Sequence, residues 1–125
     1  MPLVRVDLPA GMTAEQRQTI SDVIDDAMRT TIDVPANDRF HLFTAGDRIY
    51  DRSYLNIERS DGTIFIAVTL RSGRTVEKKR AFYAAIADGL HARLGTRKED
   101  VFIVLSENDL SDWSFGNGIA QYSPG

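Results

Sequence analysis

The chain has 125 residues, no cysteine and a formal net charge of −3. This length is typical of a single domain (1–125) that buries its core without disulfides. The charge argues against nucleic acid or an anionic membrane as a partner, and no apolar run approaches the ~18 residues of a membrane span. With two histidines far apart in the sequence we expect no metal and no cofactor. The missing thiols and the absence of a signal-peptide pattern favour a cytoplasmic protein.

The first part of the chain predicts a strand, a helix and a second strand. Residues 2–8 alternate between apolar and polar side chains, as in a strand. Thr13 and Gln16 have the spacing of a capping box, and apolar side chains at spacing four predict a helix to about Thr31. Residues 38–44 alternate again and predict the second strand.

The same order of elements follows a long polar connection. Residues 45–62 are long for a connection, and we expect a short strand around 54–58. Residues 64–70 are apolar on both faces, which predicts a central, buried strand. A second helix is expected to end at about Leu94, and residues 100–105 predict the fourth strand.

The two halves of the chain repeat each other without a gap at a shift of 62 residues. The aligned pairs include Val4 and Ile66, Gly11 and Gly73, Thr13 and Thr75, Asp38 and Asp100, and Phe40 and Phe102. Each half, about 2–45 and 63–106, is a β-α-β unit, and a C-terminal tail follows. Strands linked in this way are parallel. We therefore predict an α+β fold: a tandem β-α-β repeat, with a four-stranded mixed sheet and two helices on one face. The uncovered opposite face predicts an oligomer.

Four segments resemble the tautomerase superfamily. They are Pro2-Leu3, Val34-Pro35-Ala36-Asn37-Asp38-Arg39, Phe82-Tyr83 and Asp112-Trp113-Ser114-Phe115-Gly116. Within that superfamily the chain looks most like the malonate semialdehyde decarboxylase branch. The resemblance implies a tautomerase (MIF-like) fold, a homotrimer with three sheets around a central barrel, and an active site at each amino-terminal proline.

The same resemblance implies roles for individual residues. Pro2 matches the catalytic amine and Asp38 the active-site aspartate, while Trp113 and Phe115 match aromatic residues that bind substrate near the pocket. Asp38 has a structural alternative, because it could simply cap a strand end.

The two arginines resemble a second branch. Arg74 aligns with the second arginine of the decarboxylase, but the spacing in Arg71-Ser72-Gly73-Arg74 is similar to that of the cis-3-chloroacrylic acid dehalogenase branch. That branch has a histidine where this chain has Met28, so dehalogenation is not expected. Two guanidinium groups and the backbone N–H groups of a strand-to-helix turn favour an anion, which predicts a small carboxylate substrate that carries a carbonyl.

Pro2 would carry a free secondary amine if Met1 is removed, and such an amine titrates near ~8. Arg71 and Arg74 would lower its pKa, whereas an ionised Asp38 would raise it. A protonated amine suits a malonate semialdehyde decarboxylase-like lyase with hydratase or tautomerase side activity. A neutral amine suits an isomerase, a keto–enol tautomerase of a 2-oxo acid. The remaining alternative is a catalytically silent trimeric binding module.

The catalytic residues also constrain the topology. Pro2 begins the first strand, whereas Arg71 and Arg74 follow the end of the third strand. The beginning of one strand meets the end of another only where the two are antiparallel neighbours. The sequence therefore predicts that the first and third strands are antiparallel neighbours at the centre of the sheet.

Overall fold

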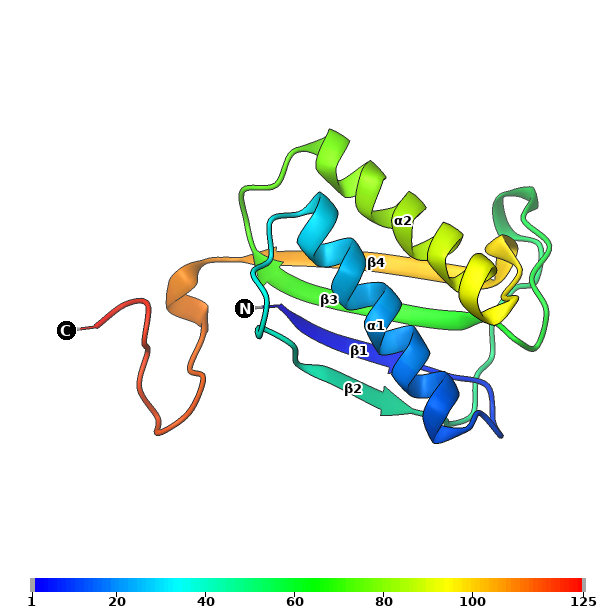
Figure 1. Cartoon of the computed structure of the whole chain (residues 1–125), viewed down its shortest axis with the longest axis horizontal. Helices are drawn as coiled ribbons and strands as arrows, with labels where there is room; N and C mark the ends of the chain where they lie inside the picture. Colours follow the sequence, from blue (N-terminus) through cyan, green and yellow to red (C-terminus); the bar gives the residue numbers. More distant parts are fainter. Residues whose placement is uncertain (1, 125) are drawn as a thin grey trace.

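The structure, a computed structural model, describes residues 2–124 and contains one four-stranded sheet with two helices. The helices and strands are, in chain order, β1 (Leu3–Asp7), α1 (Ala14–Thr31), β2 (His41–Thr44), β3 (Ile64–Arg71), α2 (Val76–Leu94) and β4 (Val101–Asn108). Three short 3₁₀ turns are η1 (Tyr54–Asn56), η2 (Lys98–Asp100) and η3 (Leu110–Asp112). Both helices cover the same face of the sheet (Figure 1), which confirms the predicted fold class.

The strand order is β2-β1-β3-β4. Within each half the two strands are parallel, and the halves meet through the antiparallel pair of β1 and β3. In that pair Leu3 lies opposite Thr69. The predicted antiparallel centre is therefore confirmed. The starts of β1 and β2 and the ends of β3 and β4 lie at one edge of the sheet.

Side-chain caps fix both helices where the sequence predicts them. The Oγ1 of Thr13 accepts from the backbone N–H of Gln16 at 3.1 Å, and the side chain of Gln16 accepts from the N–H of Thr13 at 2.9 Å. Thr75 caps α2 by accepting from the N–H of Lys78. Gly95 ends α2 at φ 72°, which favours glycine. Within residues 2–124 no helix is long and apolar enough to cross a membrane.

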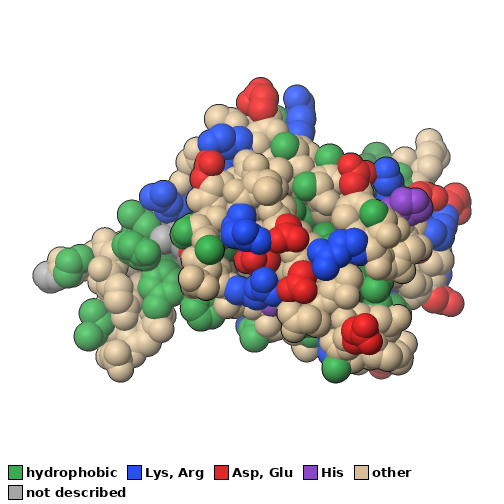
Figure 2. Space-filling view, viewed as in Figure 1, with side chains coloured by type: hydrophobic (Ala, Val, Ile, Leu, Met, Phe, Trp, Pro, Cys, Tyr) green, Lys and Arg blue, Asp and Glu red, His purple; other side chains and the backbone are tan. Residues whose placement is uncertain are grey.

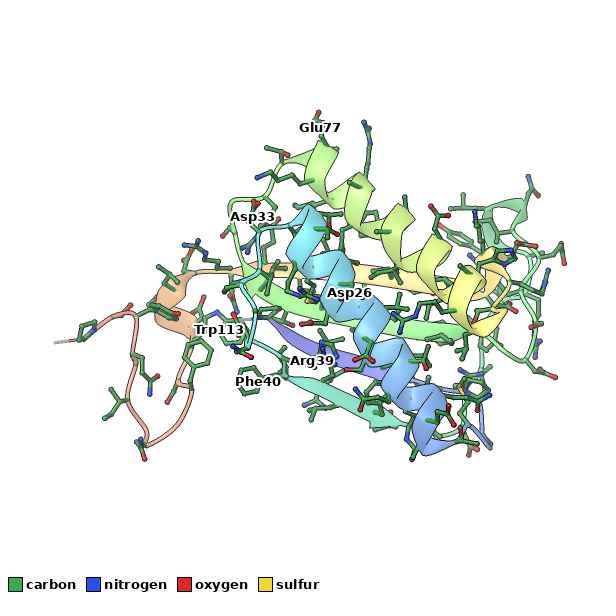
Figure 3. All side chains as sticks on the ribbon, in the orientation of Figure 1. Asp26, Asp33, Arg39, Phe40, Glu77 and Trp113 are labelled. Atoms are coloured by element: carbon green, nitrogen blue, oxygen red, sulfur yellow. The ribbon has the colours of Figure 1, made fainter. Side chains whose placement is uncertain are left out.

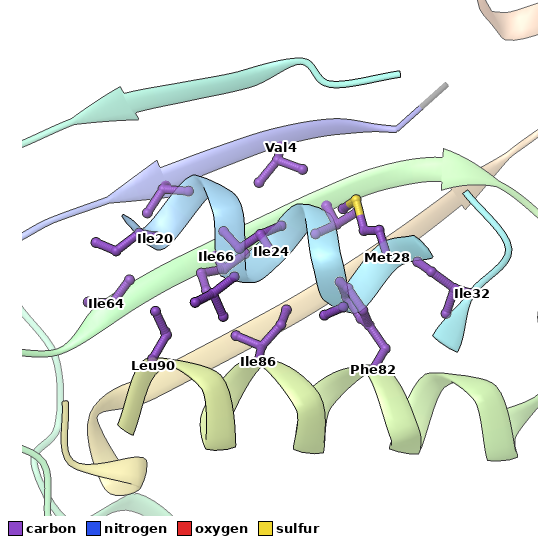
Figure 4. Close-up of a cluster of buried hydrophobic side chains, with 14 of the residues drawn as sticks. Val4, Ile20, Ile24, Met28, Ile32, Ile64, Ile66, Phe82, Ile86 and Leu90 are labelled. Carbon is purple, nitrogen blue, oxygen red and sulfur yellow. The ribbon is translucent and has the colours of Figure 1, made fainter. Parts of the chain in front are cut away.

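The core lies between the sheet and the two helices (Figure 4). Its largest fully buried side chains are Val4, Leu8, Ile20, Ile24, Met28, Ile32, Ile64, Ile66, Leu70, Phe82, Ile86 and Leu90. The helices approach closely at Gly89, where an added Cβ would lie 2.7 Å from Cγ1 of Val23. The apolar stripes read from the sequence thus form one contiguous core.

Some predicted strand boundaries are wrong. β2 starts at His41 instead of residue 38, because Asn37 turns the chain at φ 63° and pairing with β1 begins opposite His41. Residues 54–58 contain η1 and not a strand, since Leu55 and Asn56 are both left-handed. β4 begins after η2 and runs three residues beyond the predicted end.

Much of the face of the sheet opposite the helices is exposed, although Arg48 and Tyr50 pack against Phe65 of β3. On the outer strand β4, Phe102 and Val104 are 41% and 46% exposed, and their repeat equivalents Phe40 and Leu42 are 52% and 44% exposed. Ala67 of the central strand β3 is exposed as well. β3 is therefore buried on one face only, whereas the sequence predicted burial on both.

Candidate active site

The predicted catalytic residues come from segments that end at one edge of the sheet. Pro2 precedes β1, Asp38 precedes β2, and Arg71 is the last residue of β3. Arg71 lies opposite Asn108, the last residue of β4. The C-terminal tail leaves the sheet at this same edge, beside the start of β1 (Figure 1).

Pro2 is buried and lines an aromatic pocket of about 450 Å³. This aromatic pocket is formed mainly by Pro2, Phe40, Thr69, Asn108, Trp113 and Phe115. The rings of Trp113 and Phe115 stack, with centroids 5.5 Å apart and planes 7° apart. Phe40 and Trp113 lie at the same end of the sheet (Figure 3). The structure therefore brings three predicted site residues, Pro2, Trp113 and Phe115, together.

The other three predicted residues line a second hollow of about 230 Å³, the arginine pocket. Its wall includes Asp33, Asp38, Arg71, Arg74, Leu110 and Tyr122. Segments 38–40, 69–71 and 110–112 contribute to both hollows, so the two pockets lie side by side. The six predicted residues are thus divided between two adjoining pockets at one edge.

Arg74 is held in place by the backbone. Its Nε donates to the carbonyl of Ile32 at 3.0 Å, and its Nη1 donates to the carbonyl of Arg71 at 3.1 Å. Partial burial lowers the pKa of Arg74 below its usual value, and the charge of Arg71 lowers it further. The guanidinium remains charged and leaves Nη2 to donate from a fixed position.

Arg71 is exposed, and no side chain or carbonyl within residues 2–124 accepts from its guanidinium. Two backbone donors of the turn are already used: the N–H of Ser72 donates to the carbonyl of Asn108 at 2.8 Å, and that of Gly73 to Oε2 of Glu107 at 3.2 Å. These two N–H groups are therefore not left for an anion, whereas the guanidinium groups of Arg71 and Arg74 still have N–H donors to offer.

Two further residues of the pockets did not emerge from the sequence. Asn108 lies beyond the predicted end of the fourth strand, and its position opposite Arg71 depends on the register of β3 and β4. Tyr122 packs edge to face against Phe115 at 5.6 Å, although six residues of irregular chain separate them. Local sequence carries no signal for either contact.

No group of three or more histidine, aspartate or glutamate side chains among the described residues is arranged to hold a metal ion. The two pockets at this edge present Pro2, the carboxylate of Asp38, two arginines and aromatic rings.

Comparison with known proteins places the chain in a family. Two family models, each described as a tautomerase enzyme, match residues 2–44 and 36–116. The probable tautomerase YusQ of Bacillus subtilis (strain 168) is 44% identical over 124 residues, which cover 97% of this chain and 98% of the relative. The chain belongs to the tautomerase family and is an enzyme of the tautomerase superfamily.

Solved structures agree with this assignment. A malonate semialdehyde decarboxylase inhibited by 3-bromopropiolate is 41% identical with a TM-score of 0.88, covering 96% of this chain and 93% of its own. Another malonate semialdehyde decarboxylase, whose structure bears on decarboxylase and hydratase activities, is 32% identical with the same TM-score, covering 96% and 95%. A fused 4-OT that forms a symmetric trimer is 25% identical with a TM-score of 0.76, covering 94% of each chain.

Proposed function

We propose that Pro2 is the catalytic amine of an enzyme that decarboxylates a small 3-oxo acid such as malonate semialdehyde, with hydratase or tautomerase side activity. The observation that supports this most is the adjoining position of the two pockets, one lined by Pro2 and the other by Asp38, Arg71 and Arg74. The 41% identity to a malonate semialdehyde decarboxylase also favours it. The predicted removal of Met1 concerns a residue outside those described and remains a prediction.

The reaction needs a proton donor at the carbonyl oxygen of the substrate. When the bond to the carboxylate carbon breaks, its electron pair moves to form an enolate, and CO₂ leaves. A protonated Pro2 donates to the enolate oxygen and so stabilises the charge that develops there. An ionised Asp38 at the same edge keeps the amine protonated by raising its pKa. Protonation of the enolate carbon then gives the aldehyde product.

The two arginines contact different parts of the substrate in this reaction. Arg74 is fixed by two backbone carbonyls, so its free Nη2 can stabilise the enolate without reorganising. Arg71 is exposed and can hold the substrate carboxylate through a charge-assisted contact. That contact weakens as CO₂ forms. Arg71 therefore stabilises bound substrate more than the transition state and contributes to KM more than to kcat.

Keto–enol tautomerisation of a 2-oxo acid is the second candidate. The observation that favours it is the full-length match, at 44% identity, to a probable tautomerase. In this reaction neutral Pro2 acts as a base on a carbon acid, which requires that the charges of Arg71 and Arg74 outweigh that of Asp38 at the amine.

We also propose that the chain forms a homotrimer. Phe40, just before β2, and Leu42 on β2, together with Phe102 and Val104 on β4, are exposed and leave apolar surface on this face of the sheet. The trimeric assembly of a fused 4-OT with the same fold supports three copies. Sedimentation velocity should give three times the chain mass at micromolar concentration, and a stable monomer there would contradict this assembly.

The test of the reaction uses protein whose intact mass establishes that Pro2 is the first residue. Malonate semialdehyde should release acetaldehyde and CO₂, with kcat falling as pH rises through the pKa of the amine. Enolisation of a 2-oxo acid by a neutral amine would instead rise with pH. If such protein turns over neither 3-oxo nor 2-oxo acids, the proposed function is wrong.

A further inference from the structure

Asn108 connects the two pockets through its backbone. Its carbonyl accepts from both the N–H and the Oγ of Ser72, at 2.8 and 2.9 Å. Ser72 lies in the turn between Arg71 and Arg74, and Asn108 pairs directly with Arg71 across the two strands. The position of Asn108 is therefore tied to the segment that carries both arginines.

The side chain of Asn108 is oriented by the tail. Nε1 of Trp113 donates to its Oδ1 at 2.7 Å. An indole N–H is only a donor, so the amide atom that faces it must be the oxygen, and this assigns the amide orientation without ambiguity. The amide nitrogen Nδ2 is left on the other side with two N–H groups to donate. Within residues 2–124 no acceptor engages it.

This free donor belongs to a residue of the aromatic pocket. Asn108 lines that pocket together with Pro2, Phe40 and Thr69. Among the described residues, Oδ1 of Asp7 is the buried side-chain polar atom that lacks a hydrogen bond, and Nδ2 of half-buried Asn108 is not buried in this way and so remains accessible. An accessible neutral donor beside a catalytic amine suits an oxygen on which negative charge develops.

We infer that Asn108 contacts the substrate, with Nδ2 donating to the carbonyl oxygen that becomes the enolate oxygen, and that Trp113 is a positioning residue that holds this amide in the required orientation. The inference rests on the proposed function at Pro2. The carbonyl oxygen is the expected acceptor because the carboxylate is drawn to the arginine pocket, whereas Asn108 lines the pocket of the amine.

Kinetics of three variants test the inference. Asn108→Ala should lower kcat by ~10²-fold, as expected for loss of one oxyanion donor, with KM changed less than threefold. Asn108→Asp keeps the acceptor for Trp113 but replaces the amide donor with an oxygen. Its kcat should therefore be no higher than that of Asn108→Ala. Trp113→Phe keeps an aromatic wall, removes the indole N–H and should lower kcat less than Asn108→Ala does.

The double variant separates positioning from packing. If Trp113 acts through the amide, Asn108→Ala combined with Trp113→Phe should be no slower than Asn108→Ala alone. A purely structural role for either residue predicts independent, multiplying effects together with a lower unfolding temperature. Multiplying losses, or a normal kcat in folded Asn108→Ala, would overturn the inference.

A binding measurement distinguishes this inference from the reaction itself. In ¹⁵N-labelled wild-type protein the side-chain amide signals of Asn108 are assigned by their loss in Asn108→Asp. Titration with pyruvate, which carries a carboxylate and a carbonyl but cannot lose CO₂ to form an enolate, should shift these signals. A shift without turnover of any oxo acid upholds the contact and refutes the reaction. Turnover with unshifted signals refutes the contact and leaves the reaction standing, and absence of both overturns both.

Discussion

The two edges of the sheet hold equivalent aspartates in opposite environments. Asp100, at the edge where β3 and β4 begin, is 3% exposed. It accepts from the N–H and Oγ of Ser60, at 2.7 and 2.6 Å, and from Oγ1 of Thr63 at 3.2 Å. Its repeat equivalent Asp38 is half-buried and lines the arginine pocket at the other edge. The same position in the repeat is thus enclosed by hydrogen bonds at one edge and lines a pocket at the other.

The difference extends to the residues around each aspartate. At a shift of 62 residues Arg71 and Arg74 correspond to Pro9 and Met12, which carry no charge. The long connection also reaches the Asp100 edge, where Arg48 donates to the carbonyl of Asp61 at 2.7 Å and Tyr50 to that of Ser60. The internal repeat supplies two equivalent edges, and only one of them carries the arginine pair, which is why the proposed reaction is assigned to that edge.

Among substitutions at the two edges, Arg74→Ala is expected to have the largest effect on kcat. It removes a fixed donor to the developing enolate, so kcat for malonate semialdehyde should fall by ~10²–10³. The matched control is Met12→Ala at the equivalent position of the closed edge, which should leave kcat unchanged. Steady-state kinetics of both variants make the measurement, and equal kcat values for the two would mean that Arg74 has no part in the reaction.

Removal of each aspartate should affect a different property: stability for Asp100 and catalysis for Asp38. Asp100→Ala removes the acceptor of the N–H and Oγ of Ser60 and one of the two acceptors of Thr63, so it should lower the free energy of unfolding by about 3 kcal/mol. Asp38→Ala should lower kcat, because the amine of Pro2 would lose the carboxylate that keeps it protonated, whereas Asp100→Ala should leave kcat nearly unchanged. An equal fall in kcat in the two variants would contradict the distinction between the edges.

Arg71→Ala should have a smaller effect, confined to binding. Loss of one charge-assisted contact at an exposed position should raise KM about tenfold, with kcat unchanged or slightly higher. Arg71→Lys, which keeps the charge, is the control and should recover part of the affinity. A large fall in kcat would show that Arg71, and not Arg74, stabilises the transition state.

The remaining prediction concerns stability alone and involves His41 on β2, whose repeat equivalent is Ile103. Oγ of Ser21 lies 2.7 Å from Nδ1 of His41, and Arg39 donates to the same Oγ at 3.1 Å. Burial, followed by the charge of Arg39, lowers the pKa of His41 from 6.5 to about 4.

The nearby carboxylates of Asp22 and Asp25 act in the opposite direction but do not reverse this shift. Because the unfolded chain binds the proton more readily, stability should fall as pH drops from 6.5 to about 4 and should lose this dependence below that range. Urea unfolding at several pH values measures the slope, and His41→Gln should remove it. An unchanged slope in His41→Gln would assign the dependence to other groups.

Local patterns were enough to predict much of the fold. The two helices begin at Thr13 and Thr75 as the capping signals require. The antiparallel contact of β1 and β3 followed from the need to bring Pro2 and Arg71 to one edge. The left-handed residues Leu55 and Asn56 were not predicted, because neither side chain signals that conformation.

The site was less predictable than the fold. Asp38 and Asp100 both stand two residues before a phenylalanine, so the sequence alone could not tell the structural aspartate from the candidate catalytic one. The anchoring of Arg74 on the carbonyl of Ile32 joins positions 42 residues apart. Such contacts depend on how the halves pack, which no local pattern records.

The most direct test of the central claim is kcat for malonate semialdehyde in Pro2→Ala, with the amino terminus verified by mass. The variant keeps an amine but loses the ring that holds its nitrogen in the pocket. Since misplacement of a catalytic group by about 1 Å can cost ~10² in rate, kcat should fall by about that factor. The exposed Pro124→Ala is the control and should retain the wild-type rate. Full activity of Pro2→Ala towards malonate semialdehyde would contradict the assignment of Pro2 as the catalytic amine.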